Sequence, residues 1–179
     1  MKVFLILFVA LTAGVGSAEC PNNPAIEVEL NQAYEKLKFA KFPKDAQLVV
    51  NQLWGLWTKA PDERAQQLLK SGMLRMRQGD LVKAEADLTR LIDYCPNYAE
   101  GYNQRAFARY LALDFENALP DLITALELRP RHLGALSGKG LTHKAMGQER
   151  EAEIEFRKAL ALNPFMPERN MIPNLGVDL

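Results

Sequence analysis

The sequence predicts an all-α solenoid of stacked antiparallel helix hairpins. Between Ala65 and Pro164 a 34-residue pattern is written three times without insertion or deletion. Prolines, alanines and small residues each keep one phase in every copy: Pro96, Pro130 and Pro164; Ala84, Ala118 and Ala152; Gly72, Ala106 and Gly140. A fixed period of this length indicates supersecondary units that bury their apolar faces only by stacking on one another.

The first 18 residues have the pattern of a secretory signal peptide. Lys2 precedes an apolar run over residues 3–13, and Gly16-Ser17-Ala18 supplies a small-residue end. The apolar run is shorter than the roughly 18–20 residues needed to span a bilayer, which disfavours an uncleaved anchor. We therefore expect cleavage after Ala18 and export, and the short signal with its uncharged end favours a bacterial periplasm.

Cys20 and Cys95 are the only cysteines, and Cys20 lies in an irregular leader over residues 19–24. An even count in an exported chain permits one disulfide, which would fasten the leader to the end of the first repeat. Two free thiols are the alternative, and the spacing lacks the CxxC pattern of redox or metal sites. Glu19 disfavours a lipid-modified Cys20, because such a cysteine directly follows a small residue.

Composition argues against several functional classes. The full chain has 22 Lys and Arg against 22 Asp and Glu, so no basic excess is available to hold a phosphate backbone, and nucleic acid is disfavoured. No further apolar run in the mature chain is long enough to span a membrane. The two histidines, His132 and His143, stand in no pattern of a catalytic triad or metal site, and no phosphate-binding glycine loop occurs. We expect no enzyme activity, cofactor or metal.

Residues 25–64 predict a helical hairpin in which the repeat pattern is eroded. Pro43-Lys44-Asp45 separates the two helices of this hairpin, and Asp45 is the expected cap of the second helix. Its two apolar stripes are Ile26, Leu30, Ala33, Leu37 and Ala40, then Leu48, Val49, Leu53, Leu56 and Trp57. We expect a degenerate unit that caps the stack, with Trp54 and Trp57 as rim and core residues rather than a ligand platform.

The three regular repeats occupy residues 65–98, 99–132 and 133–166. Each predicts two amphipathic helices joined by a tight turn and ended by a proline. In the second repeat Asp114 is the expected cap of the second helix, and Pro120 should delay or bend that helix. A tail over residues 167–179 follows, with a short helix from Pro167 that Pro173 ends.

The tail should pack back on the third repeat through Met171, Ile172 and Leu175. The alternative is that this end of the solenoid meets a partner or a second copy of the chain.

The residues that recur in phase resemble the tetratricopeptide repeat. They are Leu68, Gly72, Gly79-Asp80, Ala84, Leu88, Leu91, Ile92 and Pro96; Tyr102, Ala106, Asp114, Ala118, Leu122, Ala125, Leu126 and Pro130; and Leu136, Gly140, Gly147, Ala152, Phe156, Ala159, Leu160 and Pro164. The resemblance implies a right-handed superhelix whose concave groove, lined by the first helix of each repeat, receives a peptide or a partner's helix.

The family's groove phases select a partner-binding set on this chain. The set is Leu69, Met73, Met76, Arg77, Asn103, Phe107, Tyr110, Leu111, Ser137, Leu141 and Lys144. Its methionines and aromatic residues suit desolvated contacts with an apolar segment, although some of them could instead pack between the helix layers. Members that capture a C-terminal carboxylate use Lys, Asn and Arg at phases where this chain has Leu69, Met73, Gln104, Gly134 and Gly138. That mode of binding is disfavoured.

The chain also departs from the family where an aromatic is usual. It has Arg75, Arg109 and His143 there, and an acid follows each after twelve residues: Asp87, Asp121 and Glu155. One hypothesis is a ladder of base–acid pairs between the two helices of each hairpin, and the alternative is solvated surface charge.

These observations predict a non-catalytic protein-interaction module, an exported scaffold or adaptor similar to small bacterial repeat proteins. Its expected partner is a peptide or helix of another extracytoplasmic protein. The alternative function is a structural protein that self-associates through the end of the solenoid.

Overall fold

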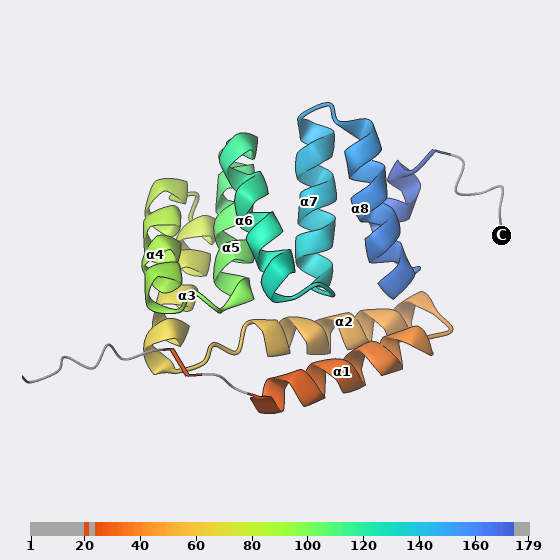
Figure 1. Ribbon diagram of the computed structural model, residues 1–179, viewed down its shortest axis with the longest axis horizontal. Coiled ribbons are helices and arrows are strands. Elements are labelled where there is room, and N and C mark those ends of the chain that lie inside the picture. The colour runs from red at the N-terminus through yellow and green to blue at the C-terminus, as the bar shows by residue number, and fades with distance from the viewer. Residues whose placement is uncertain (1–19, 22–23, 174–179) are drawn as a thin grey trace, which may run out of the picture.

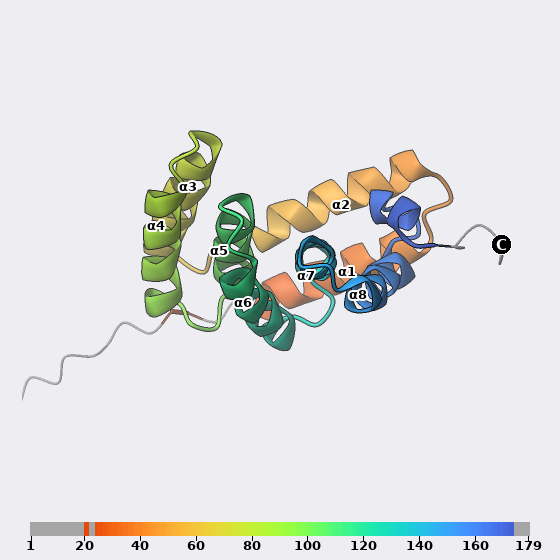
Figure 2. The same cartoon turned by 90° about the horizontal axis from the view of Figure 1, so that it is seen from above.

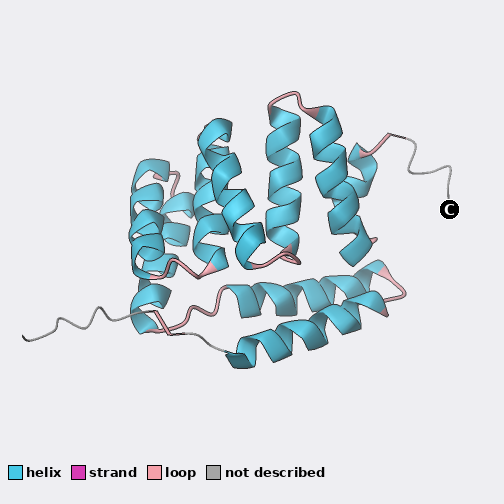
Figure 3. Ribbon diagram, in the orientation of Figure 1, coloured by secondary structure: helices cyan, strands magenta, loops and turns pink. Residues whose placement is uncertain are grey.

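The computed structural model describes residues 20–21 and 24–173, so the predicted signal peptide and Leu175 lie outside the described residues. This part contains eight α-helices, one 3-10 helix and no strand (Figures 1 and 3). The helices are α1 (Pro24–Lys38), α2 (Pro43–Trp57), α3 (Glu63–Arg77), α4 (Leu81–Tyr94), α5 (Ala99–Leu111), α6 (Phe115–Leu128), α7 (Leu133–Ala145), α8 (Glu149–Leu162) and the 3-10 helix η1 (Pro167–Met171). The predicted all-α solenoid is confirmed.

Helices α3 to α8 form three antiparallel hairpins that stack side by side, each packing on the next (Figures 1 and 2). The small-residue phase lies where the two helices of a hairpin cross. A Cβ atom on Gly140 would lie 2.3 Å from Phe156, and one on Gly72 would lie 2.6 Å from Leu88. A side chain at these positions would force the helices apart, so the close approach explains why the phase is small.

The N-terminal hairpin does not stack on the first repeat, which corrects the prediction that it extends the stack as a terminal unit. Helices α1 and α2 instead lie across the lower ends of α6, α7 and α8 (Figure 1). Their stripe shares one core with Leu133, Leu136 and Ala159 of the third repeat. Helical periodicity specifies which face of a helix is buried but does not specify the neighbour that buries it.

Two further contacts fasten the chain ends. Cys20 and Cys95 form a disulfide in the structure, which joins the leader to the end of α4 across 75 residues of sequence. At the other end Ile172 is buried against Ala152 and Phe156, so the tail packs back on the third repeat. Met171 is 41% exposed and takes no part in that contact, contrary to expectation.

Two of the expected helix starts differ in detail. Phe42 occupies the cap position before α2 in place of Asp45, and Pro43 is the first helical residue. Asp114 precedes α6, but its side chain accepts no backbone hydrogen bond. Pro120 does not delay α6, which begins at Phe115 in the same phase as α4 and α8. None of the described helices has the length and apolar character needed to cross a bilayer.

Buried acids tie the two helices of each hairpin together. In the first, Asp87 accepts hydrogen bonds from Ser71 at 2.6 Å and from the Arg75 Nε at 2.6 Å. In the second, Asp121 pairs with Arg105 at 2.7 Å and with Arg109 at 2.9 Å. The expected pair twelve residues apart is therefore present in both hairpins.

The third hairpin departs from this ladder. Glu155 pairs with Lys139 and Lys158, both at 3.0 Å, whereas His143 contacts Gln148. The shared feature of all three hairpins is a donor sixteen residues before the acid: Ser71, Arg105 and Lys139. This donor lies on the first helix of each hairpin, one turn before the base that the sequence suggested. From there its side chain reaches the buried acid on the second helix.

These contacts set the charge state of two acids. Burial by itself would raise the pKa of Asp87, but hydrogen bonds from Ser71 and Arg75 outweigh it and hold the pKa below the ordinary 3.8. Burial likewise opposes the hydrogen bonds from Lys158 and Lys139 at Glu155, whose pKa nevertheless lies below the ordinary 4.5.

We expect Asp87→Asn to lower the free energy of unfolding by about 1.5–3 kcal/mol at pH 7, because it removes a charged acceptor shared by Ser71, Arg75 and Arg90. A depressed folded-state pKa gives stability that is complete above the ordinary value of 3.8 and is lost as pH falls through the folded-state value. The gap between wild type and variant should therefore close below about pH 4. Urea unfolding between pH 3 and 7 measures it. Exposed Asp93→Asn on the same helix is the control, and a gap that is independent of pH would contradict the role of the Asp87 charge.

The turn between the two helices of a hairpin needs a left-handed residue. Gly79 and Gly147 adopt φ values of 78° and 75°, and Leu113 adopts 62° at the same phase of the second repeat. A left-handed conformation costs a residue with a Cβ about 1–2 kcal/mol, whereas glycine adopts it freely.

Leu113→Gly should therefore raise the free energy of unfolding by about 0.5–1 kcal/mol, after allowance for the greater freedom of glycine in the unfolded chain. Leu113 is 74% exposed, so little packing is lost. The reverse change, Gly79→Leu, should destabilise by a similar amount. Urea unfolding measures both changes, provided that the variants have the same m-value as wild type. A destabilised Leu113→Gly variant would show that the leucine side chain contributes more stability than the left-handed backbone costs.

Candidate functional site

An uncharged groove lies between α5 and α7 on the inner side of the stacked repeats. Its cavity has a volume of about 230 Å³. The residues that line it come from α2, α5, α6 and α7: Trp54, Asn103, Gln104, Ala106, Phe107, Tyr110, Leu122, Gly134, Gly138, Leu141 and Thr142. None of these side chains carries a charge, so the groove favours apolar or neutral atoms.

The depth of the groove comes from two glycines of α7. Gly134 and Gly138 present no side chain, and a Cβ atom on Gly138 would already lie 3.1 Å from Leu122. Phe107 from α5 and Trp54 from α2 border the opening, and they are 50% and 43% exposed. Large apolar side chains left open to water beside a cavity are the usual mark of a contact surface.

Beneath the groove lies a buried polar network centred on Glu100. Asn103 donates to its carboxylate at 3.2 Å, and Gln104 also donates to it. His132 contacts the same carboxylate at 2.8 Å, although the sequence suggested no role for this histidine. Because His132 Nδ1 accepts from the Ala135 N–H, the neutral ring carries its proton on Nε2 and donates it to Glu100.

The network reaches the N-terminal hairpin through Trp57. Its ring stacks on His132 with centroids 4.2 Å apart, and its carbonyl accepts a hydrogen bond from Tyr98 at 2.6 Å. Burial raises the pKa of Tyr98 well above its ordinary value, so the hydroxyl remains a donor. These contacts hold α2 against the repeats and thereby place Trp54 at the groove.

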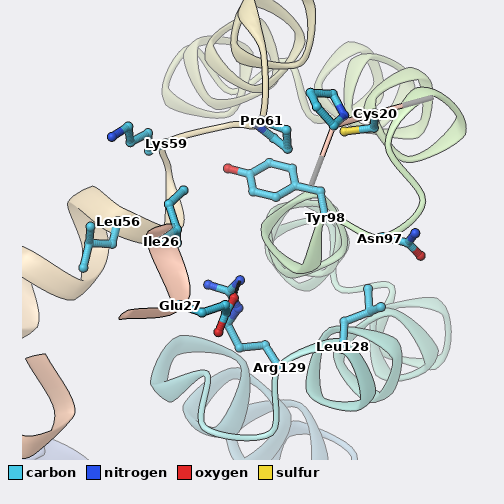
Figure 4. Close-up of a pocket in the computed structure, with 11 residues that line it drawn as sticks. Cys20, Ile26, Glu27, Leu56, Lys59, Pro61, Asn97, Tyr98, Leu128 and Arg129 are labelled. Atoms are coloured by element: carbon cyan, nitrogen blue, oxygen red, sulfur yellow. Dashed lines mark hydrogen bonds and ion pairs between the residues drawn. The ribbon is translucent and has the colours of Figure 1, made fainter. Parts of the chain in front are cut away.

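A second cavity, of about 300 Å³, lies where the leader, the hairpin and the repeats meet. Figure 4 shows Tyr98 reaching into it, with Glu27 and Arg129 beside one another at its wall. Those two side chains form an ion pair at 2.6 Å. Its walls join α1 to the second repeat, so this cavity belongs to the attachment of the hairpin. In the described part of the chain, no group of three or more His, Cys, Asp or Glu residues is arranged to hold a metal ion.

The structure places the predicted partner-binding residues in three environments: the groove, the core and positions outside the cavity. Four of them line the groove: Asn103, Phe107, Tyr110 and Leu141. Leu69 and Met76 are corrected to core positions, because they are 0% and 9% exposed among Ala65, Leu88 and Ala108.

The remaining predicted residues lie outside the cavity. Met73 is half-buried against the core of the first repeat, while Arg77 and Leu111 are exposed. Lys144 pairs with Glu149 at 3.0 Å, and the hydroxyl of Ser137 donates to Glu168. Gln104, Gly134 and Gly138 occupy phases that the family uses for carboxylate capture, and they line the cavity without a charge. Trp54 lies outside the repeats, so no repeat phase could select it.

Comparisons with known proteins agree with this geometry. A family model described as tetratricopeptide repeat matches residues 133–165. A TPR repeat-containing protein of Rhizobium etli is 27% identical over 75% of this chain and 66% of its own. Tetratricopeptide repeat protein 36 of Xenopus tropicalis is 30% identical over 66% of this chain and 60% of its own, so the chain spans about two thirds or less of these relatives.

Solved structures show the same arrangement of helices. The first TPR of Spaghetti (RPAP3), bound to an HSP90 peptide, is 25% identical, with a TM-score of 0.59 over 60% of this chain and 86% of that one. MamA, at 20% identity, has a TM-score of 0.52 over 76% of this chain and 77% of its own and shares the fold. Together with the repeats and their stacking, these likenesses show that the chain belongs to the tetratricopeptide repeat family.

Proposed function

We propose that this protein is an exported, non-catalytic interaction module that binds an apolar segment of another extracytoplasmic protein in the groove between α5 and α7. The observation that carries the proposal is the uncharged cavity bordered by exposed Phe107 and Trp54. Peptides bound to related repeat domains, such as the HSP90 peptide on the first TPR of Spaghetti, support protein binding as the activity.

The lining points to an apolar ligand rather than a charged peptide end. Gln104, Gly134 and Gly138 line the cavity, so no ammonium or guanidinium is present there to hold a carboxylate. Side chains such as leucine or phenylalanine match its size and its apolar walls. A helix or extended segment with one or two such residues would place them between Phe107 and Leu141.

The self-association alternative would need an uncovered end of the third repeat. Ile172 and Glu168 lie over that end and are 5% and 6% exposed. This cover favours groove binding, and sedimentation distinguishes the two functions, since only a self-associating chain changes mass with concentration.

We expect Phe107→Glu/Leu141→Glu to weaken partner binding at least about 30-fold, because two carboxylates would have to be desolvated in an apolar cavity. Extracytoplasmic partners are captured on wild type and variant and compared by mass spectrometry. The interacting segment is then titrated as a synthetic peptide, with Trp54 fluorescence as the signal. Ile123→Glu/Ile154→Glu is the matched control, since these residues are 40% and 45% exposed on α6 and α8.

Equal binding by wild type and the groove variant would contradict the proposed site. Capture of nothing but the protein itself, with a mass that rises with concentration in sedimentation, would favour self-association instead. Circular dichroism of each variant establishes that its helices are intact.

Export makes a separate prediction. The protein recovered from the extracytoplasmic fraction should lack residues 1–18, and alkylation should find no free thiol, because Cys20 and Cys95 form a disulfide. Intact mass measurement before and after reduction tests both. A full-length, fully alkylated protein in the cytoplasmic fraction would contradict export.

A further inference from the structure

The turn between α1 and α2 carries a surface that groove binding does not use. Four lysines, Lys36, Lys38, Lys41 and Lys44, are interleaved with two phenylalanines, and all of the lysines are exposed. Phe39 is 73% exposed and Phe42 is 65% exposed. We call these six residues the hairpin tip.

The tip is an ordered projection. Figures 1 and 2 both place the α1–α2 turn at one end of the molecule, beyond α8. The Phe39 N–H donates to the Lys36 carbonyl at 3.2 Å, and the Phe42 carbonyl accepts from the N–H groups of Asp45 and Ala46 at 3.1 and 3.2 Å. Leu37, two residues before Phe39, is 1% exposed and packs in the core that the hairpin shares with the third repeat. The backbone therefore holds both phenylalanine rings outward.

The charge around these rings is one-sided. No acid occurs between Lys36 and Lys44, and the flanking acids are Glu35 and Asp45. Neither the lysines nor the flanking acids form an ion pair in the described structure, so the four ammonium groups remain free to face a partner. The Lys38 Nζ lies 6.0 Å from the centroid of the Phe39 ring.

We propose that the hairpin tip docks on an anionic lipid surface. The two rings would enter the boundary between headgroups and acyl chains, and the ammonium groups would lie at the lipid phosphates. A projecting tip favours a bilayer over a protein partner, because lipids rearrange around it and no matching cleft is required. The phenylalanines supply apolar contact, and the lysines supply selectivity for negative charge.

This contact would leave the groove accessible. Phe42 immediately precedes α2 and Trp54 lies in its last turn, so about 18 Å of helix separates the tip from the groove at the standard rise per residue. The inference stands apart from the proposed function and is tested without a protein partner.

Vesicle flotation with phosphatidylglycerol–phosphatidylcholine vesicles, and with pure phosphatidylcholine vesicles, tests the proposal. Wild type and variants are expressed with all 179 residues, and intact mass establishes that all carry the same N-terminus. Phe39→Ser/Phe42→Ser should reduce binding to the anionic vesicles at least about tenfold. Lys41→Gln/Lys44→Gln should reduce it about fivefold per lysine, and added salt should have a similar effect on wild type.

Val82→Ser/Leu113→Ser is the matched control, because these residues are 81% and 74% exposed on other elements. Binding that requires anionic lipid, survives in this control and is lost in both tip variants supports the proposal. Equal binding of wild type and tip variants overturns it. The absence of binding to the anionic vesicles also overturns it.

Discussion

The arrangement outside the three repeats depends on one buried contact, in which Trp57 stacks on His132 while His132 donates to Glu100. His132 and Glu100 are 0% and 1% exposed, so neither can exchange its partner for water. An unpaired carboxylate at such depth would be costly, and Glu100 is compensated by the two amides of α5 as well as by the histidine. The hairpin supplies none of these donors, but Trp57 covers the His132 ring and its carbonyl accepts a hydrogen bond from Tyr98, and these two contacts specify where the hairpin lies.

The groove follows from that position. The repeats alone supply Phe107, Leu141 and the two glycines, but they leave the groove open toward α2. Trp54 closes that side because it lies on the helix that Trp57 fastens, three residues away. Asn103 and Gln104 connect the two regions directly, since each lines the cavity and also donates to Glu100. Changes to the buried network and changes in ligand affinity should thus be coupled through these amides.

Sequence reasoning succeeded where a residue's role is local and repeated. The recurring small residues Gly72 and Gly140 mark the close crossings, and the spacing of Arg75 from Asp87 predicted a cross-helix pair. It failed where the role depends on a neighbour distant in sequence: the hairpin's apolar stripe gave no sign of Leu133 or Leu136 as its partners. The residues of the candidate site show the same difference between local and distant signals. Phe107 and Leu141 follow from repeat phase, whereas Trp54 contributes only because of tertiary placement.

The two proposed surfaces share one rigid element. Helix α2 begins beside the hairpin tip and ends beside the groove, and its buried residues Leu53, Leu56 and Trp57 hold it to the repeats. If the tip lies on a membrane, the direction in which the groove opens relative to that membrane is set by α2 rather than by a flexible linker. The disulfide from Cys20 to Cys95 also ties the leader before this hairpin to the end of α4 in the first repeat. A module built in this way would present its groove at a constant height and angle above the lipid, which favours partners whose apolar segment lies close to the membrane surface.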